Sequence, residues 1–362
     1  MFFSKREAAR IDEPEISQRQ INIPTTVLEV KLESKLKQFV KVEISIEDVE
    51  EFTAIQSLRS KTEMKGKEGI CFGVIVKDEQ CHLTLEGKRN FSAAVLLRLV
   101  VPNSMLIAFT GKLINGHLSV VGNGQYMNSV KVIGQDVKVD IEELLADYTE
   151  CMLGDGKIEI TNSIIKKIDL VANQGAKIVN ADTNKMKILS IRGVSISNLL
   201  VKDTISIVTV SGKVKADVCF PDTCKGQAVI KTVTGKITGT IADYYKATLE
   251  TVNAGIDVQL KPLDRKTTTK LDSYGFEGGY QVHTRHHDAA IDNGENVDLI
   301  QEKNNIDIYE PQQNIYISED GAEQEVPDEK PNGPPTVEKI EFSHDESMVF
   351  AEGSKVNISF LE

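Results

Sequence analysis

One phrase occurs three times in the chain, as Thr209-Val-Ser-Gly-Lys-Val214, Thr232-Val-Thr-Gly-Lys-Ile237 and Thr251-Val-Asn-Ala-Gly-Ile256. Its alternation of polar and apolar residues is typical of half-buried strands. The glycine marks a corner, because a coil that bends there needs a residue that tolerates positive φ or close approach of another backbone. We expect such structural glycines at Gly156, Gly212 and Gly235.

The interval between the repeats indicates the architecture. The apolar residue that follows each corner recurs every 18 to 24 residues, at Leu113, Val137, Ile158, Ile178, Ile196, Val214, Ile237, Ile256 and Phe276. Strand-like alternation within a unit of about 20 residues is typical of a β-solenoid and of neither a helix bundle nor a propeller. The sequence therefore predicts an all-β, single-chain solenoid of about nine rungs over residues 95–317.

The same alternation predicts which side chains form the outer surface. We expect Val210 and Val233 to point inward together with Val214, and the polar residues between them to point outward. The outward set, a lateral face rich in threonine, serine and lysine, is Thr209, Ser211, Lys213, Lys215, Thr232, Thr234, Lys236 and Thr238. Such a face could bind a protein partner or a second copy, or it could be an ordinary solvated surface whose lysines discourage sheet pairing.

The rest of the chain divides by composition. Residues 1–25 are expected to form a flexible N-terminal arm, and residues 26–94 a β-rich cap with a possible short helix at 47–59, where apolar residues recur three apart. The segment 141–152 has high helix propensity and could also leave the coil as a helix. Residues 318–337 form an acidic, proline-rich loop, and residues 338–362 are predicted to return as capping strands.

The repeated phrase resembles the putative-adhesin family of β-solenoids, whose bacterial members repeat Thr-Val-Ser-Gly-x-Ile. The resemblance covers roughly residues 95–300 and is strongest over 209–260. With the Val100-Val101-Pro102 turn before the rungs, the layout is similar to that of uncharacterised eukaryotic members of the family. The resemblance implies a fold and no activity, and it supplies no catalytic motif from which a functional residue could be carried over.

Composition excludes several functional classes. The chain has 362 residues, a net charge of −12, 40% hydrophobic residues and 27% charged residues, as an ordinary folded protein does. The longest apolar run, Ala93 to Leu97, is far shorter than the roughly 20 residues of a membrane span. Residues 288–352 hold 18 acidic residues and three lysines. The negative balance argues against nucleic acid as a partner.

Cysteine usage and the N-terminus bear on the compartment. Five cysteines at irregular spacing do not make a disulfide framework, which favours a reducing compartment and buried thiols. The first ten residues lack the apolar core of a secretory signal, so we expect a cytoplasmic protein. Three basic residues near the start leave a mitochondrial location as the alternative, although Glu7, Asp12 and Glu13 oppose it.

The densest metal-ligand candidates are His283, His286, His287 and Asp288. Imidazoles and a carboxylate suit zinc. On an extended strand, however, His283 and His287 lie on one face and the other two residues on the opposite face, so a solvated edge is the favoured interpretation. Cys219 and Cys224 flank a proline corner but lack two further ligands. No cofactor is expected.

Catalytic signals are weak. The repeated Gly-Lys pairs do not match a phosphate loop, and the outward carboxylates Asp217 and Asp257 have no partner acid of the kind a glycosidase needs. No small-molecule ligand is indicated. The sequence therefore favours a non-enzymatic scaffold or interaction protein, and its rival is a carbohydrate-active or metal-dependent enzyme built on the same coil.

Overall fold

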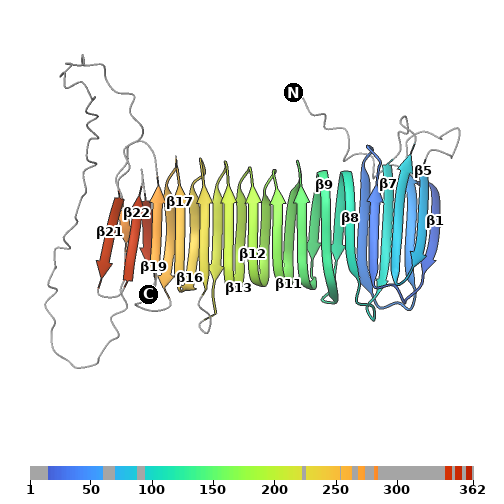
Figure 1. The fold of residues 1–362 in the computed structure, drawn as a ribbon, viewed down its shortest axis with the longest axis horizontal. Coiled ribbons are helices and arrows are strands. Elements are labelled where there is room, and N and C mark those ends of the chain that lie inside the picture. Colours follow the sequence, from blue (N-terminus) through green and yellow to red (C-terminus); the bar gives the residue numbers. More distant parts are fainter. Residues whose placement is uncertain are drawn as a thin grey trace, which may run out of the picture.

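The computed structural model describes residues 15–59, 70–87, 94–221, 226–252, 254–262, 268–273, 281–283, 339–344, 347–352 and 356–360. These residues contain strands and no helix, and the chain forms a β-solenoid of about 8 turns with about 19 residues per turn. The expected all-β solenoid is confirmed, close to the nine rungs of 20 residues. Figure 1 shows a rod with β1 at one end and β21 at the other. In this part of the chain no helix is long and apolar enough to cross a membrane.

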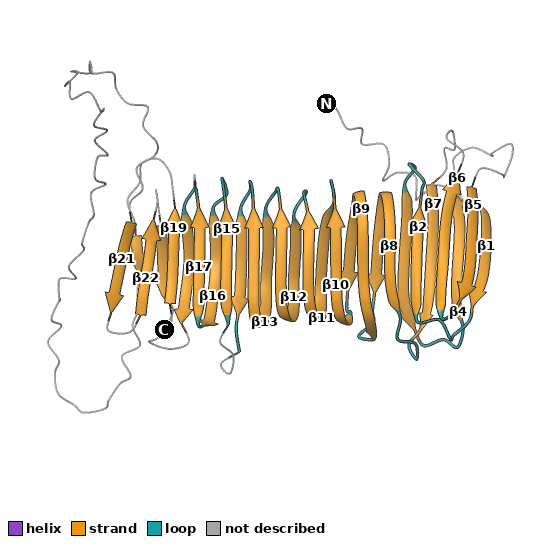
Figure 2. Cartoon of the chain, in the orientation of Figure 1, coloured by secondary structure: helices purple, strands orange, loops and turns teal. Residues whose placement is uncertain are grey.

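The strands fall into three groups along the rod (Figure 2). The first group is β1 (Glu15–Ile23), β2 (Glu29–Ser34), β3 (Val40–Glu47), β4 (Phe52–Arg59), β5 (Ile70–Lys77), β6 (Gln80–Gly87) and β7 (Ala94–Pro102). The second is β8 (Ala108–Val121), β9 (Tyr126–Glu142), β10 (Leu145–Leu153), β11 (Lys157–Ala172), β12 (Ala176–Ser190) and β13 (Val194–Thr209). The third is β14 (Val214–Cys219), β15 (Gln227–Thr232), β16 (Ile237–Tyr244), β17 (Lys246–Thr251), β18 (Ile256–Pro262), β19 (Thr268–Ser273), β20 (Gln281–His283), β21 (Lys339–His344), β22 (Ser347–Glu352) and β23 (Val356–Phe360).

Each turn of the coil contributes to two faces. Residues 157–161, 176–179 and 194–197 stack in parallel with β3, β7, β14, β16 and β18, and we call this surface face A. Residues 164–172, 181–190 and 204–209 stack with β2, β6, β10, β15 and β17, and we call this surface face B. The apolar core lies between the faces, with columns such as Ile160, Ile178 and Ile196 fully buried.

The corner from face A to face B is made by asparagine. Asn162, Asn180 and Asn198 have φ of 50°, 53° and 52°, a left-handed conformation that asparagine tolerates better than most residues. The Asn180 side chain donates from Nδ2 to Oδ1 of Asn162 at 3.1 Å, and Asn198 donates to Asn180 at 3.0 Å. Three successive turns are thus linked by stacked amides at this corner.

The corner from face B to face A needs glycine. Gly212 has φ of 94°. A Cβ atom on Gly193 would lie 2.5 Å from the carbonyl oxygen of Lys213, and one on Gly156 or Gly235 would overlap the carbonyl oxygen of the preceding turn more severely. Any side chain at these positions would force neighbouring turns apart.

The N-terminal region continues both faces, without a break in pairing at residue 94. Strands β2 and β6 pair on the face B side of β8, and β3 and β7 pair on its face A side. The helix expected within 47–59 is wrong: β4 is a strand between β1 and β7, and Phe52, Ala54 and Leu58 are buried. Residues 15–23, expected within the flexible arm, form β1.

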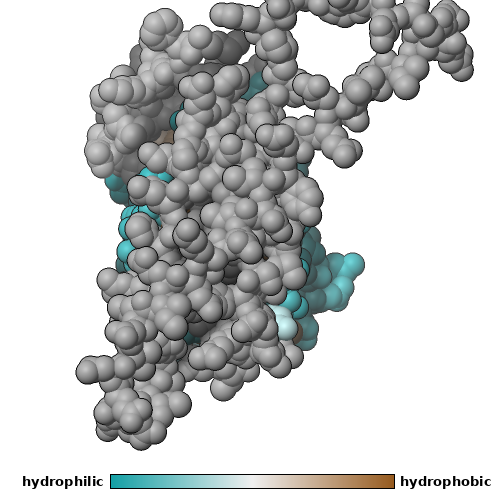
Figure 3. Space-filling view, turned by 90° about the vertical axis from the view of Figure 1, so that its left-hand side faces the viewer, coloured by the Kyte–Doolittle hydropathy of each residue, from teal (hydrophilic) through white to brown (hydrophobic). Residues whose placement is uncertain are grey.

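Strand pairing likewise overrides helix propensity at 141–152. This segment is the end of β9 and most of β10, which pairs in parallel with both β9 and β11. At the other end of the rod β23 pairs with β18 and β22 with β19, so the C-terminal residues 347–352 and 356–360 extend the stack. Seen along the rod from the β21 end, the described side chains visible at its sides are mostly hydrophilic (Figure 3).

Candidate interaction surface

The predicted threonine, serine and lysine face is wrong at two of its four threonines, Thr209 and Thr232. Thr209 and Thr232 are only 1% and 4% exposed, whereas Val210 and Val233 are 51% and 42% exposed. The strands end at these threonines, and the glycine corner that follows interrupts the alternation of side chains. The repeated phrase therefore places threonine inside the corner and valine outside it, the reverse of the expected order.

The other predicted residues are accessible, but most already have partners. The hydroxyls of Ser211 and Thr234 donate to backbone carbonyls of the preceding turn at 2.9 and 3.3 Å. Lys215 forms an ion pair with Asp217 at 3.2 Å and Lys236 one with Asp257 at 2.7 Å. Thr238 is half-buried and Lys213 is exposed. These contacts stabilise the corner. Of the three predicted lysines, only Lys213 forms no ion pair with a described residue.

A shallow groove of about 380 Å³ crosses this corner. Gly175 and Gly193 form part of its lining, and its lysines are Lys157, Lys177, Lys213 and Lys215. Lys177 and Lys215 are paired with Glu159 and Asp217. The groove is basic but broad and open, with no buried polar side chain directed into it among the described residues.

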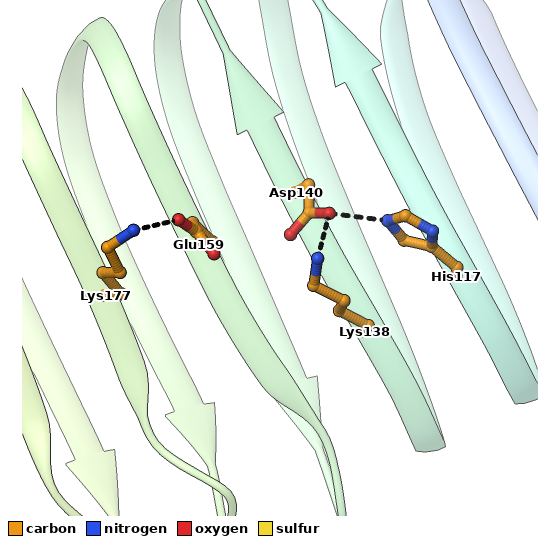
Figure 4. Close-up of polar contacts among 5 residues, drawn as sticks. All are labelled: His117, Lys138, Asp140, Glu159 and Lys177. Atoms are coloured by element: carbon orange, nitrogen blue, oxygen red, sulfur yellow. Dashed lines mark hydrogen bonds and ion pairs between the residues drawn. The ribbon is translucent and has the colours of Figure 1, made fainter. Parts of the chain in front are cut away.

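Face A carries ladders of ion pairs on its outer surface. Oδ2 of Asp140 lies 2.7 Å from Nε2 of His117 and 2.5 Å from Nζ of Lys138 (Figure 4). Further along the face, Lys177 forms an ion pair with Glu159. Partial burial raises the pKa of the Asp140 carboxyl, but hydrogen bonds and charge from His117 and Lys138 outweigh it and hold the pKa below its usual value. The His117–Asp140 and Lys177–Glu159 contacts link adjacent turns, whereas Lys138 and Asp140 lie on the same strand.

Face B carries an apolar stripe on its outer surface. One outward position is apolar in five consecutive turns, with Ile133 next to Met152, Met152 next to Val171, Val171 next to Leu189 and Leu189 next to Val208. The side chains of Ile133, Met152 and Val208 are 48%, 47% and 37% exposed, and the other two are half-buried. At about 4.8 Å per turn, the stripe is about 19 Å long.

A second apolar row lies beside the stripe at the glycine corner. This corner ridge consists of Ile191, Val210, Val233 and Val252, all exposed and each bonded through its backbone to the turn before or after it. Leu189 and Val208 of the stripe are two residues from Ile191 and Val210, so the two rows meet. Among the described residues, no exposed large hydrophobic side chain lies on a face A strand.

The sequence contains a signal for the stripe that the repeat pattern obscures. Each stripe residue adjoins a buried apolar residue, as in Val132-Ile133, Ile188-Leu189 and Ile207-Val208. Successive residues of a strand point to opposite faces, so the second member of each pair must point outward. The stripe positions recur at intervals of 18 or 19 residues, which matches the length of a turn.

The candidate metal and catalytic residues form no site in the described part of the chain. His286, His287, Asp288 and Cys224 lie outside it, and His283 is at the end of β20. No group of three potential metal ligands occurs among the described residues. Cys219 donates to Oδ2 of Asp243 at 3.3 Å. Asp217 and Asp257 are each paired with a lysine and do not face each other as two catalytic carboxylates would.

The described thiols differ in exposure. Burial raises the pKa of the Cys151 thiol to about 12 and that of Cys81 to about 11. Such thiols are inert at neutral pH because the reactive form is the thiolate. Cys71 on β5 is exposed, contrary to the expectation of buried thiols throughout.

The chain is a β-solenoid whose outer surface differs between its two faces. No protein-family model and no curated protein matches it. Among solved structures it is similar to a "putative cell adhesion protein" of Clostridium sporogenes, at 11% identity and a TM-score of 0.30 over 55% of this chain and 99% of the other. A "putative adhesin" of Parabacteroides merdae matches at 8% identity and a TM-score of 0.38, over 72% of this chain and 96% of the other.

A further "putative adhesin", from Parabacteroides distasonis, is 12% identical with a TM-score of 0.31, over 69% of this chain and 95% of the other. At these scores the three likenesses carry no inference about function.

Proposed function

We propose that this protein is a non-enzymatic scaffold whose face B binds a protein partner through the apolar stripe. The observation that carries the proposal is a row of apolar side chains, three exposed and two half-buried, at one outward position in five consecutive turns. Single exposed apolar residues are common on soluble proteins, but contiguous rows with polar borders mark interaction sites.

The surroundings of the stripe fit a polar rim. The neighbouring outward row contains Lys131, Glu150, Asp169 and Lys187. Within it, Nζ of Lys131 lies 3.8 Å from Oε2 of Glu150. Beyond it, Tyr148 lies between the ammonium groups of Lys131 and Lys167, at 5.3 and 4.8 Å from the ring centre. An apolar centre bordered by charges of both signs is the usual anatomy of a protein interface.

The spacing of the stripe favours an amphipathic helix as the docking element. Adjacent stripe residues are separated by about 4.8 Å, and a helix presents one apolar position per turn of about 5.4 Å. A helix of about 13 residues along the rod could therefore place an apolar side chain against each turn. The backbone of face B is already paired on both sides, so the partner must bind through side chains and cannot add a strand there.

We propose that the accessible residues of the predicted threonine, serine and lysine surface form the border of this binding site. Lys213, Thr234 and Lys236 lie next to the corner ridge and would contact the periphery of a partner that covers Val210 and Val233. Charges at such a rim affect association rate more than affinity. We accordingly expect their removal to weaken binding less than changes in the stripe.

The proposal is tested by a photo-crosslinking amino acid placed at Val208 of the full chain in its native cell. Ser197, which points outward from face A, is the matched control. We expect one protein adduct from position 208 and none from position 197, with the partner identified by mass spectrometry. Equal adducts from the two positions, or none from 208, would remove the basis for the proposal.

We place the protein in the cytoplasm, with the mitochondrion as the alternative. An exposed thiol, Cys71, together with buried unpaired thiols suits a reducing compartment. Fractionation of the native cell, with imaging of the tagged full chain, separates the two locations. Recovery outside both compartments would contradict the assignment.

A further inference from the structure

Within the described part of the chain, the rod has an unpaired strand edge at its N-terminal end. Strand β5 (Ile70–Lys77) pairs only with β6 among the described residues, so no described strand pairs with the other side of its backbone. Its sequence, Ile-Cys-Phe-Gly-Val-Ile-Val-Lys, has β-branched and aromatic residues and a single charge. Edges of this composition pair readily with other chains.

Strand β1, the edge of face A at the same end of the rod, carries the protection that β5 lacks. β1 (Glu15–Ile23) has an irregularity in its pairing between Glu15 and Ser17, and its sequence is largely polar. β5 pairs with β6 without a register shift and contains neither proline nor an internal charge. Natural edge strands avoid association by bulges, charges and proline, so the contrast singles out β5.

The hairpin fixes which backbone groups of β5 are available. Asp78 and Glu79 connect Lys77 to Gln80 with φ of 48° and 61°, which is a two-residue type I′ turn. The pair that closes such a turn exchanges both hydrogen bonds, so residues 77, 75, 73 and 71 bond to β6. The N–H and C=O groups of residues 76, 74, 72 and 70 therefore point to the open edge.

One contact outside the hairpin agrees with this assignment. Nη1 of Arg19 donates to the carbonyl oxygen of Phe72 at 3.3 Å, so Phe72 directs this group away from β6. The backbone groups of Val74 and Val76 are the remaining pairing sites nearest the turn. They flank Ile75, which at 63% is more exposed than any other large hydrophobic residue of the described chain.

We propose that β5 pairs antiparallel with β5 of a second copy, about a two-fold axis through Ile75. Val74 of each copy then exchanges two hydrogen bonds with Val76 of the other, and the two Ile75 residues form the closer, non-hydrogen-bonded pair. Lys77 falls opposite Gly73, so no like charges face each other. A two-fold axis requires this self-complementarity, and it explains why a second copy fits the edge.

The arrangement joins two rods end to end, because β5 lies at the end of the rod opposite β21 (Figure 1). Face B would continue from one copy into the other, and both apolar stripes would stay accessible. The dimer does not use the stripe, so this inference and the proposed function can fail separately.

Crosslinking of the full chain tests the axis. In a Cys71→Ser background, Ile75→Cys places two thiols opposite each other across the axis, and we expect a disulfide-linked dimer under mild oxidation. The control is the unaltered chain, whose exposed Cys71 lies opposite Glu79 of the other copy in this register and should crosslink poorly. Efficient crosslinking by Cys71 with none by position 75 would overturn the register.

A second variant tests the hydrogen bonds themselves. The Val76 N–H points to the open edge, so Val76→Pro removes a donor from the proposed interface and none from the β5–β6 ladder. We expect an elongated dimer of about twice the rod length by small-angle scattering for the unaltered chain, and at least a tenfold weaker dimer for Val76→Pro. Ile75→Asp, which retains the backbone, should give the same loss if the proline variant folds poorly.

Two results would contradict the proposal. A chain that stays monomeric at 100 μM by sedimentation would show that the edge is covered by its own chain or is inert. A dimer that survives both edge variants but is lost in Val208→Lys would show that copies associate through the stripe.

Discussion

Faces A and B share one coil and one set of parallel ladders, yet their outer surfaces differ. Face A presents ion pairs such as His117–Asp140 and Lys177–Glu159, and face B presents the stripe from Ile133 to Val208. The buried columns are mostly apolar on both sides. Since the inward residues stabilise the coil, the outward residues can vary without loss of the fold. The difference between the faces is therefore the clearest sign of function.

The energetics support this distinction. Exposed ion pairs contribute about 0–1 kcal/mol each, so the ion pairs of face A add little to stability. Burying a Val, Leu, Ile or Met side chain is worth about 1.5–3 kcal/mol, and the stripe leaves part of that gain unused in the isolated chain. A partner that covers five such positions would recover it.

The largest effect is expected from a substitution that prevents the turns from stacking and so disrupts both faces. In Gly235→Val, the new side chain would overlap the backbone of Gly212 in the preceding turn. We expect a loss of more than about 4 kcal/mol in the free energy of unfolding, the range of exceptional single substitutions, or failure to fold. Circular dichroism with urea denaturation measures this.

Gly124→Ala is the matched control for that substitution. Gly124, unlike Gly235, has a positive φ of 72°, but nothing lies within 4 Å of its Cβ position. Only backbone strain of about 1–2 kcal/mol is expected there. Similar losses at the two glycines would show that close stacking of turns is not the reason for glycine at position 235.

The next change removes the difference between the faces. In Leu189→Lys with Val208→Lys, the substituted positions point to solvent, so we expect stability within about 1 kcal/mol of the parent chain. Crosslinking of the partner at Met152 should fall at least tenfold, since charge in the centre of an apolar contact is costly. Ser195→Lys with Ser197→Lys on face A should leave it unchanged. Equal losses from both double variants would remove the distinction.

A smaller effect concerns the threonines inside the glycine corner. The hydroxyl of Thr232 accepts a hydrogen bond from the Gly235 N–H at 3.1 Å, whereas the buried Thr209 hydroxyl has no partner among the described residues. Replacement by valine should cost about 1 kcal/mol at position 232, and should be neutral or stabilising at position 209. Urea denaturation of both variants measures the difference, and a greater cost at position 209 would refute this assignment.

The smallest effect is the pH dependence of the ion pairs on face A. The pKa of Asp140 is lowered in the folded state, so its contribution is present above the unfolded pKa of about 3.9 and is lost as pH falls through the lower folded value. Asp140→Asn should cost no more than about 1 kcal/mol at pH 6, and the difference from the parent should shrink as pH falls below the unfolded pKa. A difference that grows toward low pH would have the wrong sign.

The sequence predicted the coil because the repeated phrase and its glycines are local signals. It could not set the register throughout. Val214, Ile237 and Ile256 do stack as expected, but Ile158 pairs with Ala176 where Ile178 was expected, a slip of two residues. A slip of two keeps the same side chains inward, so alternation alone cannot detect it.

The surface was harder to predict than the core. Alternation does not continue through the corners, where the chain bends, so it predicts the wrong sides for Thr209 and Val210. The three asparagines at 162, 180 and 198 recur every 18 residues, but their role is visible only when the turns are stacked. The open edge of β5 depends on long-range pairing and has no local signature.

The most direct test of the central claim is a photo-crosslinking scan of both faces in the native cell. Face B would be probed at Ile133, Met152, Val171, Leu189 and Val208, and face A at Glu159, Lys177, Ser195 and Ser197. We expect adducts with one and the same protein at the face B positions, and none on face A. Adducts spread equally over both faces, or confined to face A, would contradict this expectation.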